Sequence, residues 1–281
     1  MLMQRIVTAL VLAAALLAGL FLLAPAHFGW AILPAVMIAA DEWCRLAGWQ
    51  RYSVRVLFCA LLVVLLVLLC QWLGIGWLGS HFEQVDNDRV LSGTQLALAL
   101  WALLLLWIQG YPSSALLWSR WPVMAAVGLL LLAATWLAIV FILHLDSGQW
   151  WLLLAIASVA FADIGGYVFG RWLGKHKLAP VISPGKTWQG YAGGLFVNLF
   201  LAVLLSWLLG LPAFKLALLL VVVAAAAPIG DLFESMLKRH RGIKDSGAIL
   251  PGHGGVLDRI DAQMIGLPLF YLLVDLLGLA R

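Results

Sequence analysis

Long stretches without a charged residue dominate this sequence of 281 residues. The eight that matter span 6–40, 56–82, 90–119, 121–145, 147–162, 187–214, 216–230 and 262–274. A helix needs about 20 mainly apolar residues to cross a bilayer, and several of these stretches are longer than that. The first is long enough for a helical hairpin with a turn near Pro25 to Phe28. The sequence therefore predicts about nine spanning or near-spanning helices, centred near residues 15, 35, 65, 102, 133, 160, 200, 222 and 271.

The composition agrees with this reading. Hydrophobic residues make up 64% of the chain and charged residues 11%, whereas about a quarter of a soluble domain is charged. The excess of 17 basic over 13 acidic residues is too small to indicate a nucleic-acid-binding domain. We expect an all-α polytopic integral membrane protein with a catalytic loop region on its cytoplasmic side. It forms one membrane-embedded domain, 1–281, with transmembrane helices in 1–145 and the active site in 146–281.

The basic residues predict the orientation, because cytoplasmic loops near helix ends are enriched in Lys and Arg. Nine helices with a cytoplasmic N-terminus place 14 of the 17 basic residues inside. We expect the protein to lie in a bacterial inner membrane with its active site facing the cytoplasm. An alternative for residues 1–26 is a cleavable signal peptide, which Pro25 disfavours at the cleavage position.

Acidic and basic residues are most concentrated between Gly230 and Asp261. A helix through Asp231 would place Glu234 and Ser235 on the same face, and a helix through Asp258 would do the same for Asp261. Such oxygen ligands suit Mg²⁺, which takes one or two carboxylates and completes its coordination with water and phosphate oxygens. The alternative is an ordinary basic loop that touches lipid head groups, but such a loop does not require five interspersed acids.

The same segment carries groups suited to phosphates. Basic residues alternate with the acids, and His253 is flanked by glycines whose backbone N–H groups can approach an anion. A metal-assisted phosphoryl or nucleotidyl transferase needs this combination. The residues alone therefore predict that class of enzyme.

A second polar region begins at Asp163, a carboxylate within an otherwise apolar helix, and continues from Arg171 to Gln189. An intramembrane carboxylate is by default a candidate functional residue, and its alternative is a structural hydrogen bond to a neighbouring helix. The loop around Lys186 and Thr187 is not a P-loop, because Pro180 replaces the first glycine and no strand is expected before it. Lys186 and Thr187 remain candidate phosphate contacts.

The segment from Ser235 to Asp261 resembles the signature of the phosphatidate cytidylyltransferases, also called CDP-diacylglycerol synthases. The matching positions are Ser235, Lys238, Arg239, Lys244, Asp245, Gly247, Leu250, Pro251, His253, Gly254, Gly255, Asp258, Arg259 and Asp261. The stretch from Asp163 through Arg171 to Ser183 and Lys186–Trp188 is also similar to that family, although the chain departs from the pattern at Gly185 and Gln189.

The resemblance implies transfer of CMP from CTP to phosphatidic acid, which yields CDP-diacylglycerol and pyrophosphate for phospholipid biosynthesis. It implies Mg²⁺ held by Asp231, Asp258 and Asp261, with K⁺ as an additional ion, and it is compatible with a homodimer. The catalytic residues would be Asp231, Lys244, Asp245, Asp258 and Asp261. The substrate contacts would be Asp163, Ser183, Lys186, Thr187, Ser235, Lys238, Arg239, His253, Gly254, Gly255 and Arg259. CTP, phosphatidic acid and membrane lipids are the expected partners, and nucleic acid is not one.

Two other functions compete with this one. A CTP-dependent polyprenol kinase would use related chemistry, and a transporter of anionic solutes could use Asp163 and the basic loops as a pathway. A transporter predicts charges along several helices near the midplane and an internal repeat. In this sequence the charges gather in two loops.

Overall fold

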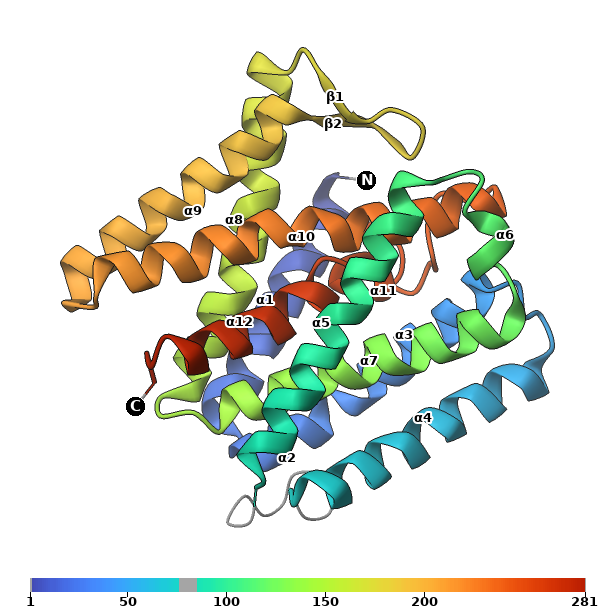
Figure 1. Cartoon of the computed structure of the whole chain (residues 1–281), viewed down its shortest axis with the longest axis horizontal. Helices are drawn as coiled ribbons and strands as arrows, with labels where there is room; N and C mark the ends of the chain where they lie inside the picture. Colours follow the sequence, from blue (N-terminus) through green and yellow to red (C-terminus); the bar gives the residue numbers. More distant parts are fainter. Residues whose placement is uncertain (1, 76–84, 281) are drawn as a thin grey trace.

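The computed structural model describes residues 2–75 and 85–280, and Figure 1 shows their arrangement. The elements in chain order are α1 (Leu2–Leu22), α2 (Pro25–Ala31), α3 (Leu33–Leu46), α4 (Tyr52–Leu73), α5 (Asn87–Gln109), α6 (Ala115–Trp118), α7 (Trp121–Leu143), α8 (Gly148–Leu173), β1 (Lys177–Ala179), β2 (Ser183–Thr187), α9 (Trp188–Leu209), α10 (Ala213–Arg241), α11 (Leu257–Ile260) and α12 (Gln263–Leu276).

Six of the described helices are long and apolar enough to cross a membrane: α4, α5, α7, α8, α9 and α10. The all-α polytopic class is therefore confirmed. The count of about nine spans is not confirmed, although each predicted centre lies within a helix. In α1 the apolar part is Ile6–Leu22, and α3 and α12 have 14 residues each. A helix of that length rises about 21 Å, less than the hydrocarbon core of about 30 Å.

The N-terminal region forms three helices, whereas the expected hairpin has two with a turn at 25–28. The difference arises because α1 ends at Leu22 and α2 begins at Pro25. Proline lies in the first turn of both α2 and α3, where its missing N–H costs no helical hydrogen bond and its fixed φ favours a new helix. Pro25 therefore starts a helix, and the expectation that it lies in a turn is wrong.

A short antiparallel hairpin, β1–β2, interrupts the helices between α8 and α9. It pairs Lys177 with Thr187 and Ala179 with Ser183, where the sequence predicts only a loop. Thr187 then caps α9, since its Oγ1 accepts a hydrogen bond of 3.1 Å from the Gly190 N–H. Figure 1 shows the hairpin projecting beyond the ends of α8 and α9.

Glycines bring α8 and α9 into close contact. A Cβ atom added at Gly190 would lie 2.5 Å from the Gly166 carbonyl oxygen, and one at Gly165 would lie 2.8 Å from that of Gly193. Small residues at such positions let helix backbones approach within a membrane. The hairpin between the two helices is consequently held on a rigid base.

Candidate active site

A cavity of about 500 Å³ opens between α8, α9, α10 and the hairpin. Its lining includes five residues predicted for the site, together with Arg171, Tyr167 and Tyr191, which sequence reasoning did not select. The five predicted residues are Asp163, Ser183, Lys186, Thr187 and Asp231. The two polar regions of the sequence therefore form one site.

An ion pair joins these two regions directly. The Lys186 ammonium of β2 lies 2.5 Å from Oδ2 of Asp231 on α10. The Ser235 hydroxyl, one turn further along the helix, donates to Oδ1 of Asp231 at 3.1 Å. The helix predicted through Asp231, Glu234 and Ser235 is confirmed.

A glycine contact brings Asp261 close to Asp231. A Cβ atom at Gly230 would lie 2.2 Å from the Asp261 carbonyl oxygen, so only glycine lets α10 meet the junction between α11 and α12 so closely. Burial, and next the charge of Asp231, raise the pKa of Asp261 to about 7. The Ala262 N–H donates to Asp261 Oδ1 at 2.7 Å and opposes that rise.

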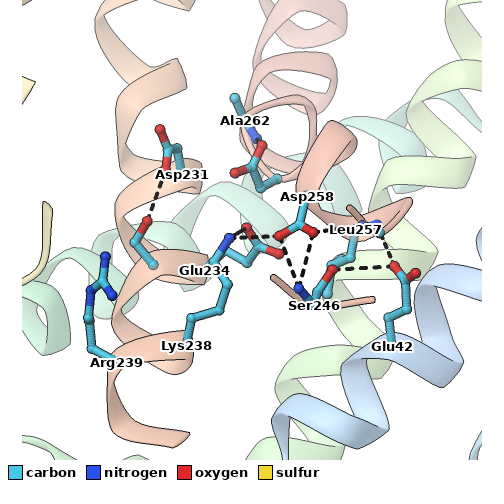
Figure 2. Close-up of polar contacts among 12 residues, drawn as sticks. Glu42, Asp231, Glu234, Lys238, Arg239, Ser246, Leu257, Asp258 and Ala262 are labelled. Carbon is cyan, nitrogen blue, oxygen red and sulfur yellow. Dashed lines mark hydrogen bonds and ion pairs between the residues drawn. The ribbon is translucent and has the colours of Figure 1, made fainter. Parts of the chain in front are cut away.

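Asp258 lies in a different set of contacts, which Figure 2 shows. Its Oδ1 lies 2.7 Å from Lys238 Nζ, and its Oδ2 accepts from the Gly255 N–H at 2.8 Å. The Ser246 N–H donates to both oxygens, at 3.2 and 3.1 Å. Burial alone would raise the pKa of Asp258, but the hydrogen bonds from Lys238 and Gly255 outweigh it and lower the pKa.

Glu234 completes this buried cluster. Its Oε2 accepts from Lys238 Nζ at 2.6 Å, and the side chain is 1% exposed. Its Oε1 is buried and has no hydrogen-bond partner among the described residues. One lysine thus contacts two carboxylates, and Glu234 Oε1 is left without a donor among the described residues.

Two carboxylates near the cavity, Asp231 and Asp261, offer oxygen ligands for a divalent metal. No group of three His, Cys, Asp or Glu side chains arranged to hold a metal occurs within 2–75 and 85–280. The charge of Asp231 nevertheless raises the pKa of the buried Asp261, and a pair of carboxylates is what Mg²⁺ ordinarily takes from a protein. In donor type and number the pair matches that requirement. The oxygens of Asp258 already accept hydrogen bonds from Lys238 and from backbone N–H groups, so its predicted role as a metal ligand has less support.

The predicted basic residues differ in their surroundings: some are held by other groups, one lines the cavity and two are exposed. Lys238 is engaged by Glu234 and Asp258, and Arg239 Nε donates to the Ile182 carbonyl at 3.1 Å, which fastens the hairpin turn to α10. Lys186 lines the cavity. Lys244 and Arg259 are exposed.

Comparison with known proteins shows which family the chain resembles. Residues 3–277 match the model of the cytidylyltransferase family. The chain is 41% identical over 276 residues to a phosphatidate cytidylyltransferase of Pseudomonas aeruginosa, covering 96% of each chain. It is 36% identical to one of Haemophilus influenzae, covering 96% of this chain and 97% of the relative.

The chain belongs to the cytidylyltransferase family. A shorter match, 45% identity over 131 residues, links it to a phosphatidate cytidylyltransferase of Staphylococcus haemolyticus and covers 46% of this chain and half of the relative. The resemblance seen in the signature is thereby confirmed.

In this cytidylyltransferase the glycine-flanked histidine forms a tight turn. The His253 N–H donates to the Leu250 carbonyl at 2.9 Å, and Gly254 has a φ of +81°, which favours glycine. The Gly255 N–H is taken by Asp258, and Nδ1 of His253 is buried without a partner among the described residues. The turn, with the exposed Lys244 and Asp245 before it, does not line the cavity described above, and the predicted contacts of His253, Gly254 and Gly255 with phosphate stay predictions.

One residue of the cytidylyltransferase that sequence reasoning missed is Glu42 of α3. It is 2% exposed and contacts the signature segment, which lies more than 200 residues later. Its only signal in the sequence is a pair of acids, Asp41 and Glu42, at the end of a long uncharged run.

Proposed function

We propose that this membrane protein transfers the CMP moiety of CTP to phosphatidic acid, yielding CDP-diacylglycerol and pyrophosphate for phospholipid biosynthesis. The observation that carries the proposal is the meeting of Lys186 and Asp231 at the cavity between α8, α9 and α10, with Asp261 close enough for the charge of Asp231 to raise its pKa. The printed names of the full-length bacterial relatives support the same activity.

The reaction needs positioning more than proton transfer. A phosphate oxygen of phosphatidic acid forms a bond to the α-phosphorus of CTP, and the bond from that phosphorus to the bridging oxygen breaks, which releases pyrophosphate. The attacking oxygen is already anionic, so the protein's task is to orient the substrates and offset charge. Lys186 and Arg171 supply positive charge at the cavity wall, and Thr187 and Ser183 supply hydroxyls there.

Asp231 and Asp261 would hold Mg²⁺, with Asp258 as a further candidate ligand and K⁺ as a candidate second ion. Bound Mg²⁺ supplies neutralisation of charge on the phosphate oxygens. The charge of Asp231, whose side chain is 31% exposed, acts on the buried carboxyl of Asp261, and a divalent cation held by both would relieve that repulsion. The Lys238–Asp258 pair would keep the adjoining loop in place.

The proposed site faces the cytoplasm, at the inner membrane of a bacterial cell. The hairpin follows the C-terminal end of α8 and precedes α9, and the Lys186–Asp231 pair ties it to the C-terminal half of α10. Basic residues are concentrated in these segments, as expected of cytoplasmic loops. CTP would enter from that side while the acyl chains of phosphatidic acid stay in lipid. We treat 1–281 as one domain.

The test is an assay of detergent-purified protein with phosphatidic acid, Mg²⁺ and CTP labelled in the cytidine. We expect labelled CDP-diacylglycerol and pyrophosphate in equal amounts, and loss of both in Asp261→Asn. Asp146→Asn is the matched control, because Asp146 is exposed in the turn between α7 and α8.

The rival functions give different products in this assay. With a polyprenol added to the assay, a CTP-dependent polyprenol kinase would release CDP and phosphorylate the polyprenol, and a transporter would yield no product. Either result, from a folded protein, would overturn the proposal.

A further inference from the structure

Glu42 is a buried carboxylate that reaches from α3 into the signature segment. Its Oε2 accepts a hydrogen bond of 2.7 Å from the Leu257 N–H and one of 3.4 Å from the Ser246 hydroxyl. Figure 2 shows Glu42 on one side of this segment and Asp258 on the other. A residue of the N-terminal third is therefore built into the segment that holds Asp258.

Two glycines of the segment make room for this carboxylate. A Cβ atom added at Gly247 would lie 2.2 Å from Glu42 Oε1, and the three nearest atoms to it would all belong to Glu42. A Cβ atom at Gly255 would lie 2.3 Å from Ser246 Oγ and 2.6 Å from Glu42 Oε2. Glu42 thus explains the absence of a side chain at 247, and Glu42 together with Ser246 explains it at 255.

Glu42 and Asp258 hold the same stretch of backbone from opposite sides. Asp258 accepts from the N–H groups of Ser246 and Gly255, while Glu42 accepts from the Ser246 hydroxyl and the Leu257 N–H. Hydrogen bonds to a carboxylate are about twice as strong as those between neutral groups. Together the two carboxylates fix both ends of the segment.

A role in stability alone would be served more simply by an apolar side chain. Burying a carboxylate is expensive, and replacing buried charges by well-packed apolar residues is often neutral or stabilising. The neighbouring acid behaves differently, since Asp41 is partly exposed and pairs with Arg45 at 2.8 Å and with Arg55. The buried carboxylate of Glu42 instead stabilises one conformation of the loop.

We propose that Glu42 is a positioning residue, which holds the segment 246–257 so that Asp258 stays on Lys238 beside the Asp231–Asp261 pair. This inference rests on the proposed function, because it assigns that segment to the active site. Glu42 does not itself reach the cavity lined by Lys186 and Asp231. It acts through the loop.

The contact with Gly247 provides a decisive test. Gly247→Ala should lower kcat in the wild-type background, because the new methyl group collides with Glu42. Glu42→Ala should lower kcat about 100-fold, the order expected when reacting groups are misplaced by about 1 Å. In the double variant the collision is gone. Adding Gly247→Ala to Glu42→Ala should therefore lower kcat by less than a further twofold. Additive losses would overturn the inference.

Hydrogen exchange supplies a measurement that does not depend on activity. In Glu42→Gln, which keeps the size of the side chain, the amides of 246–257 should exchange at least tenfold faster while those of α8 and α9 are unchanged. The KM for CTP should change less than threefold. Asp41→Asn, one residue away and outside the loop contacts, is the control and should match the wild type in exchange and kcat.

The outcomes separate the two proposals. A wild-type protein without cytidylyltransferase activity would contradict the proposed function, while loop exchange would still report on Glu42. An active protein in which Glu42→Gln leaves both loop exchange and kcat unchanged would overturn the inference alone. If Glu42→Ala fails to fold, the exchange result for Glu42→Gln decides.

Discussion

The ammonium group of Lys186 lies 2.5 Å from a carboxylate oxygen of Asp231, which ties the β-hairpin to the middle of the active-site helix α10. A metal at Asp231 and this lysine would compete for the same oxygen. The ion pair therefore predicts how the metal requirement responds when the lysine is removed.

Lys186→Met should lower the Mg²⁺ concentration needed for half-maximal activity several-fold, because Asp231 no longer has a competing cation. The same change should raise the KM for CTP, because a positive charge is lost from the cavity. Activity titrated with Mg²⁺ checks both effects. Lys177→Met on the neighbouring strand, where the lysine is exposed, is the control, and an increased Mg²⁺ requirement in Lys186→Met would contradict the competition.

The raised pKa of Asp261, about 7, predicts a pH-dependent metal affinity. Mg²⁺ needs the deprotonated carboxylate, so its apparent affinity should fall up to about tenfold per unit as the pH drops below 7. In Asp261→Asn this dependence should disappear. Calorimetric Mg²⁺ titrations at pH 6, 7 and 8 would measure it, and an equal affinity at all three values would count against Asp261 as a ligand.

The same pKa shift has a consequence for stability without metal. Between the ordinary value of 3.8 and about 7, folded Asp261 holds a proton that the unfolded chain has lost. Stability from this group is therefore greatest below 3.8 and declines as the pH rises through 7. Without metal, the Tm of the wild type should rise relative to that of Asp261→Asn as the pH falls from 8 to 6. A relative fall in Tm over this range would contradict the raised pKa.

Lys238 is the cation paired with two buried carboxylates, so its removal should be costly. Lys238→Met takes that cation from Glu234 and Asp258, whose side chains are 1% and 5% exposed. A lost partner in a buried ion pair costs about 3 kcal/mol or more. Thermal unfolding in detergent should show a lower Tm, and adding Glu234→Gln should recover part of it without restoring activity. Equal Tm values for Lys238→Met and the wild type would contradict this reading.

The close contact between α8 and α9 predicts sensitivity at Gly190. Its new Cβ atom in Gly190→Ala would lie 2.5 Å from a backbone oxygen of Gly166, and overpacking of this kind costs about 1–3 kcal/mol. The displaced helix would carry Lys186 with it, so kcat should fall as well. Gly93→Ala, where no atom lies within 4 Å of the added Cβ, should keep full activity and equal or higher stability.

The sequence predicts the helical membrane class and the region of the site because both depend on local signals. Uncharged runs mark the helices, and the charges between Gly230 and Asp261 mark the chemistry. Hydrophobicity and charge belong to each residue, wherever the folded chain places it.

What the sequence could not predict depends on contacts between distant segments. The strand β2, Ser183–Thr187, forms only because β1 pairs with it. Asp258 and Asp261 were expected on one helix face, but α11 ends after four residues at Ile260. Asp258 is hydrogen-bonded to Lys238, while the pKa of Asp261 responds to Asp231 as well as to Lys238. For Glu42 the sequence offered only its place beside Asp41, because its partners lie in another part of the chain.

The bond from Glu42 to Leu257 joins residues 215 positions apart, and this has a consequence for biogenesis. During synthesis α3 is made long before Leu257, and its buried acid must wait without its partners until the signature segment has been made. Contacts of such sequence separation form slowly, since chain entropy is lost before they are gained. The contact that fixes this segment therefore forms late, when a loop made late in synthesis closes on an early helix.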